Sequence, residues 1–93
     1  MAEPTVLLVH NCINEVLKGL GRSPRVQAVV KDEAALQDLL RRWKQSPSIH
    51  LVYFNATLLR NTIECVMGEL DDGEFKRRVG VPKAFAEAFT ERL

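Results

Sequence analysis

The chain has 93 residues, a length that fits one domain built around one hydrophobic core. Hydrophobic residues make up 46% of it and charged residues 27%, a balance that is typical of a folded protein and excludes a disordered tail. Thirteen Lys and Arg residues against twelve Asp and Glu residues leave a formal net charge of +1, which excludes a strong overall field for attracting nucleic acid or an acidic membrane.

The N-terminal sequence carries no targeting pattern that we can identify. Residues 1–9 lack a basic segment, and their apolar run VLLV is too short for a signal peptide or a membrane span. We therefore expect a cytoplasmic or nuclear protein with no membrane partner. Because Cys12 and Cys65 do not form a C-x-x-C pair, the sequence favours free buried thiols over a disulfide scaffold or a zinc site.

Four short segments have the character of β-strands. Residues 6–9, 26–30 and 49–54 are nearly continuous apolar runs rich in β-branched or aromatic side chains, which predicts strands that are buried on both faces. Residues 75–79, FKRRV, are too polar for the middle of a sheet, and Lys and Arg are common on edge strands. We therefore place this fourth segment at the edge of the predicted sheet.

A helical pattern follows each of these segments. Asp32 is a candidate N-cap for the second helix and Asn55 for the third, while Pro82 begins the last one. The apolar residues that recur at helical spacing are Ile13, Val16, Leu17 and Leu20; Ala35, Leu36, Leu39, Leu40 and Trp43; Leu58, Leu59, Ile63, Val66, Met67 and Leu70; and Ala84, Phe85, Ala88, Phe89 and Leu93.

Strands that alternate with helices through short loops predict right-handed βαβ units and a parallel sheet. The expected fold class is α/β: one domain over residues 1–93, forming a small three-layer sandwich. In it a mostly parallel sheet of three to four strands would carry helices on both faces, as in flavodoxin-like proteins.

No complete catalytic, cofactor or metal site is visible in the sequence. Cys12, in the first turn of a predicted helix, could act as a nucleophile, but the glycine-rich loop that would hold a phosphate is missing. His10 and Cys12 together supply only two of the four ligands that a structural zinc takes. The sequence therefore predicts no catalytic residue, no cofactor and no metal.

Basic residues gather in the second predicted helix, which opens with acidic ones. Arg41, Arg42 and Lys44 near its end complement the helix dipole, and so do Asp32 and Glu33 near its start. This simple account disfavours nucleic-acid binding, which stays open as an alternative.

Residues 5–70 resemble the first three βα units of a response-regulator receiver domain, with VLLV as the first strand and KDEAAL at the start of the second helix. The resemblance implies a flavodoxin-like fold. His10, Asn11 and Asn55 stand where that family has acidic residues and its phosphoacceptor aspartate, so it implies a degenerate domain that is not phosphorylated. The small flavodoxin-like F subunit of rotary V-type ATPases is similar in its order of strands and helices.

The expected function follows from the small number of helices that are available to cover the two faces of the predicted sheet. Four βα units supply two helices per face at most, which leaves a sheet edge or an apolar strip open. We therefore expect a non-catalytic protein-interaction or assembly subunit that binds a partner protein or a second copy of itself. The alternatives are a degenerate receiver-like signalling domain, a small enzyme using Cys12, and a nucleic-acid-binding subunit.

The predicted docking surface lies in the C-terminal third of the chain. There the polar edge strand adjoins the last helix, and arginine beside an aromatic residue is a common composition for the residues that dominate binding energy. The predicted partner-binding residues are Lys76, Arg77, Arg78, Phe85 and Phe89.

Overall fold

The computed structural model describes residues 2–93, and within them it contains helices and no strand. About 80% of the chain is helical. The elements in chain order are α1 (Glu3–Asn14), the π-helix η1 (Glu15–Gly19), α2 (Pro24–Val30), α3 (Glu33–Gln45), α4 (Ile49–Phe54), α5 (Ala56–Glu69), α6 (Asp72–Val79) and α7 (Lys83–Glu91).

The predicted α/β sandwich is wrong, and so is the flavodoxin-like topology. Each segment predicted as a strand lies in a helix: residues 6–9 in α1, 26–30 in α2, 49–54 in α4 and 75–79 in α6. The described residues therefore contain no sheet, and the segment placed at a sheet edge is a surface helix.

The first run illustrates why the apolar segments form helices. Leu8 and Val9 are fully buried together with Cys12 and Ile13, four positions further on. Residues separated by four lie on the same face of a helix, so the buried stripe continues through the position where the strand was expected to end. Pro4 lies in the first turn, where its missing N–H costs no hydrogen bond.

Polar side chains at the starts of α2, α4 and α6 fix where these helices begin. Ser23, Ser48 and Asp71 each accept a hydrogen bond from the backbone N–H three residues further on, at 3.3, 3.3 and 2.8 Å. A side-chain oxygen at this position satisfies one of the N–H groups that the first turn of a helix leaves unpaired. The capping residues thus favour helices in runs whose composition favours strands.

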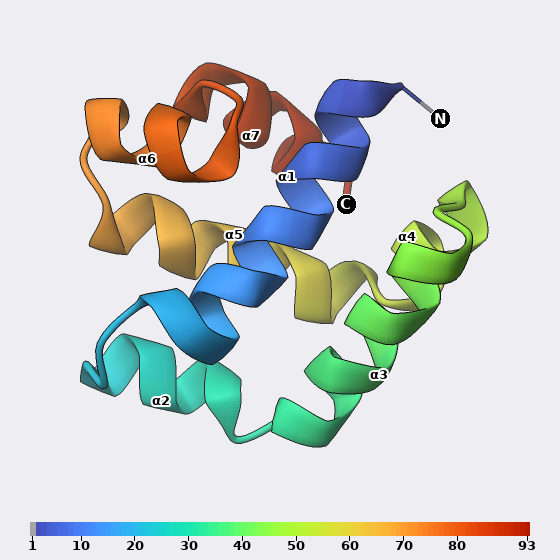
Figure 1. Cartoon of the computed structure of the whole chain (residues 1–93), viewed down its shortest axis with the longest axis horizontal. Helices are drawn as coiled ribbons and strands as arrows, with labels where there is room; N and C mark the ends of the chain where they lie inside the picture. Colours follow the sequence, from blue (N-terminus) through green and yellow to red (C-terminus); the bar gives the residue numbers. More distant parts are fainter. Residues whose placement is uncertain (1) are drawn as a thin grey trace.

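The helices pack around α5, which α1 crosses diagonally (Figure 1). α5 also contacts α2, α4, α6 and α7, and α3 lies against α1. The indole N–H of the buried Trp43 donates to the carbonyl oxygen of Val6 at 3.1 Å, which ties the last turn of α3 to the start of α1.

The helical stripes predicted from the sequence are confirmed in α3 and α5, except at Ala35, which is exposed. Their buried members form part of the hydrophobic core: Leu36, Leu39, Leu40 and Trp43 in α3, and Leu59, Ile63 and Val66 in α5. In the last helix, Phe85 and Phe89 are only partly buried and pack against this core, whereas Ala84 and Ala88, predicted on the same stripe, are exposed.

An ion pair holds η1 in place. The guanidinium of Arg78 lies 2.7 Å from a carboxylate oxygen of Glu15 and donates a hydrogen bond to the carbonyl oxygen of Gly19 at 2.9 Å. The Glu15 carboxylate lies so close to Gly19 that a Cβ there would come within 2.6 Å of it. Arg78 therefore connects both ends of η1 to α6.

The replacement Leu39→Ala should destabilise the fold strongly. Leu39 is 2% exposed on the core face of α3, so the change leaves a cavity and should lower the free energy of unfolding by about 2 to 5 kcal/mol. Urea unfolding followed by circular dichroism measures this loss. The neighbouring Gln37→Ala, at an exposed position, is the control and should stay within about 0.5 kcal/mol.

A milder loss is expected from Gly80→Ala. Gly80 ends α6 in the left-handed conformation, with φ of 94°, and a Cβ there would meet nothing closer than 3.6 Å. The cost should therefore come from the backbone alone, about 1 to 2 kcal/mol. Thermal unfolding against Gly21→Ala, where a Cβ meets nothing within 4 Å, isolates the effect, and equal melting temperatures for the two variants would contradict it.

Candidate functional site

The large apolar side chains that are most exposed to solvent lie on helix α4. Ile49 is 47% exposed, Tyr53 64% and Phe54 87%, and these are the exposed large hydrophobic residues among those described. Only Val52 of this helix is buried, and Leu51 is half-buried. We call Ile49, Tyr53 and Phe54 the α4 face.

The local sequence explains this orientation. Ser48 caps the first turn, and the side-chain amide of Asn55 donates to the carbonyl oxygen of Leu51 at 2.8 Å, closing the last turn. In a helix of this length, the buried Val52 fixes which side faces the core. Tyr53 and Phe54 follow Val52 by about 100° and 200° of helical rotation and so turn away from the core, while Ile49, one turn before Val52, is the least exposed of the three.

Exposing this face has a free-energy cost that a partner could remove. Complete burial of one large apolar side chain is worth about 1.5 to 3 kcal/mol, and aromatic residues are enriched among those that dominate protein interfaces. Single exposed hydrophobic residues are ordinary, but three on six consecutive residues concentrate apolar surface on one short helix.

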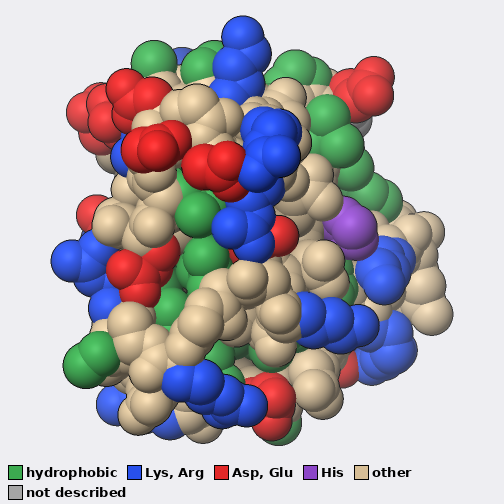
Figure 2. All heavy atoms as spheres, turned by 60° about the vertical axis from the view of Figure 1, so that its left-hand side comes forward, with side chains coloured by type: hydrophobic (Ala, Val, Ile, Leu, Met, Phe, Trp, Pro, Cys, Tyr) green, Lys and Arg blue, Asp and Glu red, His purple; other side chains and the backbone are tan. Residues whose placement is uncertain are grey.

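The chain segment around the α4 face is basic. Between Asp38 and Glu64 the sequence contains no Asp or Glu, while it contains three Arg, one Lys and the exposed His50. Elsewhere the charges are mixed: Figure 2 shows acidic and basic side chains intermingled over one face of the molecule. The basic character is therefore a property of this segment rather than of the whole protein.

The sequence did not point to the α4 face, because residues 49–54 were predicted to be a buried strand. The signal that could have identified it is Ser48, which follows Pro47 and begins the run with a typical N-cap residue. A six-residue helix between two longer ones cannot bury all of its sides, and in α4 the exposed side carries Tyr53 and Phe54.

The predicted partner-binding residues lie on α6 and α7 and point in different directions. Lys76 and Arg77 are exposed, and Arg77 pairs with Glu74 at 2.5 Å; this hydrogen bond raises the pKa of Arg77. Arg78 is instead bound to η1 through Glu15. The two arginines therefore do not present one shared surface.

Phe85 and Phe89 are half-buried on α7 and pack against the core. The five predicted residues thus comprise two exposed cations, one arginine in a structural ion pair and two aromatic residues that close the core. Their role in binding stays a prediction.

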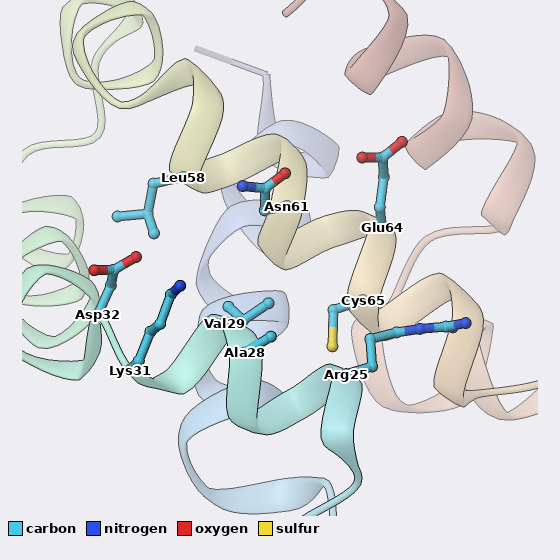
Figure 3. A pocket seen from close by; sticks show the side chains of 9 residues that line it. All are labelled: Arg25, Ala28, Val29, Lys31, Asp32, Leu58, Asn61, Glu64 and Cys65. Carbon is cyan, nitrogen blue, oxygen red and sulfur yellow. The ribbon is translucent and has the colours of Figure 1, made fainter.

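A groove of about 610 Å³ runs between α2 and α5 (Figure 3). The Cys65 thiol points toward α2 between Ala28 and Arg25, while Lys31 reaches toward Leu58. The lining residues include two cations, Arg25 and Lys31, and two carboxylates, those of Asp32 and Glu64. This balance gives the groove no preference for the charge of a ligand.

Neither cysteine is arranged as a nucleophile. Cys12 is 0% exposed and Cys65 is 2% exposed. Burial raises the pKa of the Cys12 thiol, and the neighbouring Glu15 carboxylate raises it further. Burial also raises the pKa of Cys65, with a smaller contribution from Glu69. Since the thiolate is the reactive species, both cysteines are held in their unreactive form.

The described residues, 2–93, contain no group of three or more His, Cys, Asp or Glu side chains that could hold a metal ion. These residues also contain no helix with the length and apolar character needed to cross a bilayer.

Comparison of the chain with protein-family models, with curated proteins and with solved structures found no match.

Both thiols should resist modification in the folded protein. At neutral pH we expect Ellman's reagent to react with native Cys12 and Cys65 at least about a hundredfold more slowly than with the denatured chain, because the thiols are buried and their pKa values are raised. Absorbance of the released thiolate measures the rate. Rapid labelling of native Cys12, located by mass spectrometry, would contradict this and favour an enzyme that uses Cys12.

Proposed function

We propose that this protein is a non-catalytic protein-interaction domain that binds a partner protein through the α4 face. The observation that carries the proposal is the exposure of Ile49, Tyr53 and Phe54 on one short helix. A binding role is favoured over a catalytic one because the most prominent surface feature is apolar, while both thiols are buried.

The chemistry of the partner follows from the charges of the segment that carries the α4 face. Lys44 lies close to the α4 face in sequence and forms no ion pair within residues 2–93, whereas Arg42 is paired with Asp38 at 2.9 Å; no carboxylate occurs between Asp38 and Glu64. Complementary charges around an apolar contact speed association and select the partner. The partner should therefore present an apolar surface with acidic residues at its rim.

A second copy of the chain fits this surface less well. Two copies that meet symmetrically through α4 would bring the same residues of each together, including Lys44 of both. Like charges at an interface oppose association. The proposal therefore commits to a different protein as the occupant.

The test replaces the two most exposed side chains of the α4 face together, in the variant Tyr53→Ser, Phe54→Ser. Because both project into solvent, the free energy of unfolding should change by less than about 0.5 kcal/mol. Loss of two aromatic contacts should weaken partner binding at least about thirtyfold, the effect of removing a dominant interface residue.

The measurement uses a photo-crosslinking amino acid at position 53 of the full chain in its native cell. We expect a discrete crosslinked partner, absent with Phe54→Ser and absent when the crosslinker is at exposed Gln27 on α2. The purified partner then gives the affinity of the double variant.

Arg77→Glu provides the comparison with the surface predicted from sequence. Binding that survives the double variant but fails with Arg77→Glu would move the interface to α6. A crosslink that joins two copies of the chain would instead show self-association.

A further inference from the structure

A second surface of the molecule, distinct from the α4 face, has the form of a binding groove. We propose that the groove between η1 and α3 binds an amphipathic helix of a partner protein, whose acidic N-terminal half lies against the C-terminal half of α3. This inference does not depend on the function proposed for α4.

The groove has an apolar floor between polar walls. Its volume is about 610 Å³, and it is lined by Leu17 and Lys18 of η1 together with one stripe of α3. Leu17 is half-buried and supplies most of the apolar surface at the base, where the largely buried Leu40, 8% exposed, adds a small part. A groove of this kind receives the apolar stripe of an incoming helix.

The charges along the groove are unevenly distributed. Glu33 lies at the start of α3, whereas Arg41 and Lys44 lie two to three turns further along, with Lys18 on the opposite wall. Within residues 2–93, Lys18 and Lys44 form no ion pair, while Arg41 is paired with Asp38 at 2.5 Å. One end of the α3 wall is therefore acidic and the other basic.

This polarity sets the direction of the bound helix. The stripe from Glu33 to Gln45 extends over about 18 Å, the length of three helical turns. Acidic residues are favoured in the first turns of any helix, where they complement its dipole. A helix that places such acidic turns beside Arg41 and Lys44 runs antiparallel to α3.

A peptide fits these features better than a nucleic acid does. No aromatic side chain lines the groove to stack on a base, and Glu33 would repel a phosphate chain that followed the full length of α3. The groove is also held in shape before binding, because Arg78 fixes η1 at Glu15 and Gly19. A preformed site avoids the entropy cost of ordering its walls.

The experiment uses two capped fourteen-residue peptides of identical composition and opposite charge polarity, EELAEELLKQLAKK and KKLAQKLLEELAEE. Binding to the full chain is measured by fluorescence anisotropy, and the site is located by NMR chemical-shift changes. The native protein should bind the first peptide about tenfold or more tightly than the second, with shifts at Leu17, Lys18 and the outer face of α3.

The variant Glu33→Lys, Lys44→Glu separates groove recognition from differences in helicity between the peptides. Both positions are exposed, so the fold should survive, as circular dichroism can verify. Exchanging the two charges should reverse the preference between the peptides. The matched control Tyr53→Ser, Phe54→Ser should leave the preference unchanged, because those residues lie on α4 and not in the groove.

Several results would overturn the proposal. These are failure of both peptides to bind, an unchanged preference in the charge-exchanged variant, or chemical-shift changes confined to α4, α6 or α7. Tighter binding of a labelled oligouridylate than of either peptide, with strong salt dependence, would assign the groove to nucleic acid instead. Because the α4 variant tests a different surface, either proposal can fail while the other stands.

Discussion

The packing of α1 across α5 is the contact on which the rest of the molecule depends. Leu8, Val9 and Ile13 on α1 and Leu59 and Ile63 on α5 are all fully buried. A domain of 93 residues buries a modest share of its surface, so it has one core and little stability to spare. The remaining helices obtain their positions by covering the sides of this pair, and α3 is attached to it through Trp43.

This arrangement explains why both proposed binding surfaces lie next to α3. One face of that helix is committed to the core through Leu36, Leu39 and Trp43, while its outer stripe forms a wall of the η1 groove. The short loop after α3 then leaves α4 at the periphery, where the structure can bury only part of it. A rigid core thus supports two surfaces that need no change of fold to be available.

How much the sequence could predict differs from helix to helix. The stripes of α3 and α5 were predicted correctly because each is long enough for the helical period to be seen, and their start positions at Asp32 and Asn55 were also right. The predicted reason for those starts, capping by the side chains of Asp32 and Asn55, was wrong. Neither side chain caps its helix, and the Asn55 side chain instead donates a hydrogen bond to the carbonyl oxygen of Leu51.

The strand predictions failed for a physical reason that applies to all short apolar runs. Four to six consecutive apolar residues fit a buried strand and a buried helical turn equally well, and β-branched composition then favours the strand. The helix is favoured in these runs because Ser23, Ser48 and Asp71 cap the first turns, and because the folded core buries only one side of each segment. The α4 face was not predicted because residues 49–54 were expected to form a strand. The exposure of this face also depends on how the other helices fill the core.

The distribution of aromatic residues gives the molecule two separate optical reporters. Its single tryptophan, Trp43, is 1% exposed with its indole N–H bonded to Val6, whereas its single tyrosine, Tyr53, is 64% exposed on α4. Emission excited beyond the tyrosine band therefore reports on the junction of α1 and α3, and tyrosine absorbance reports on the α4 face. Loss of the core and occupation of the surface can thus be followed in one unlabelled sample.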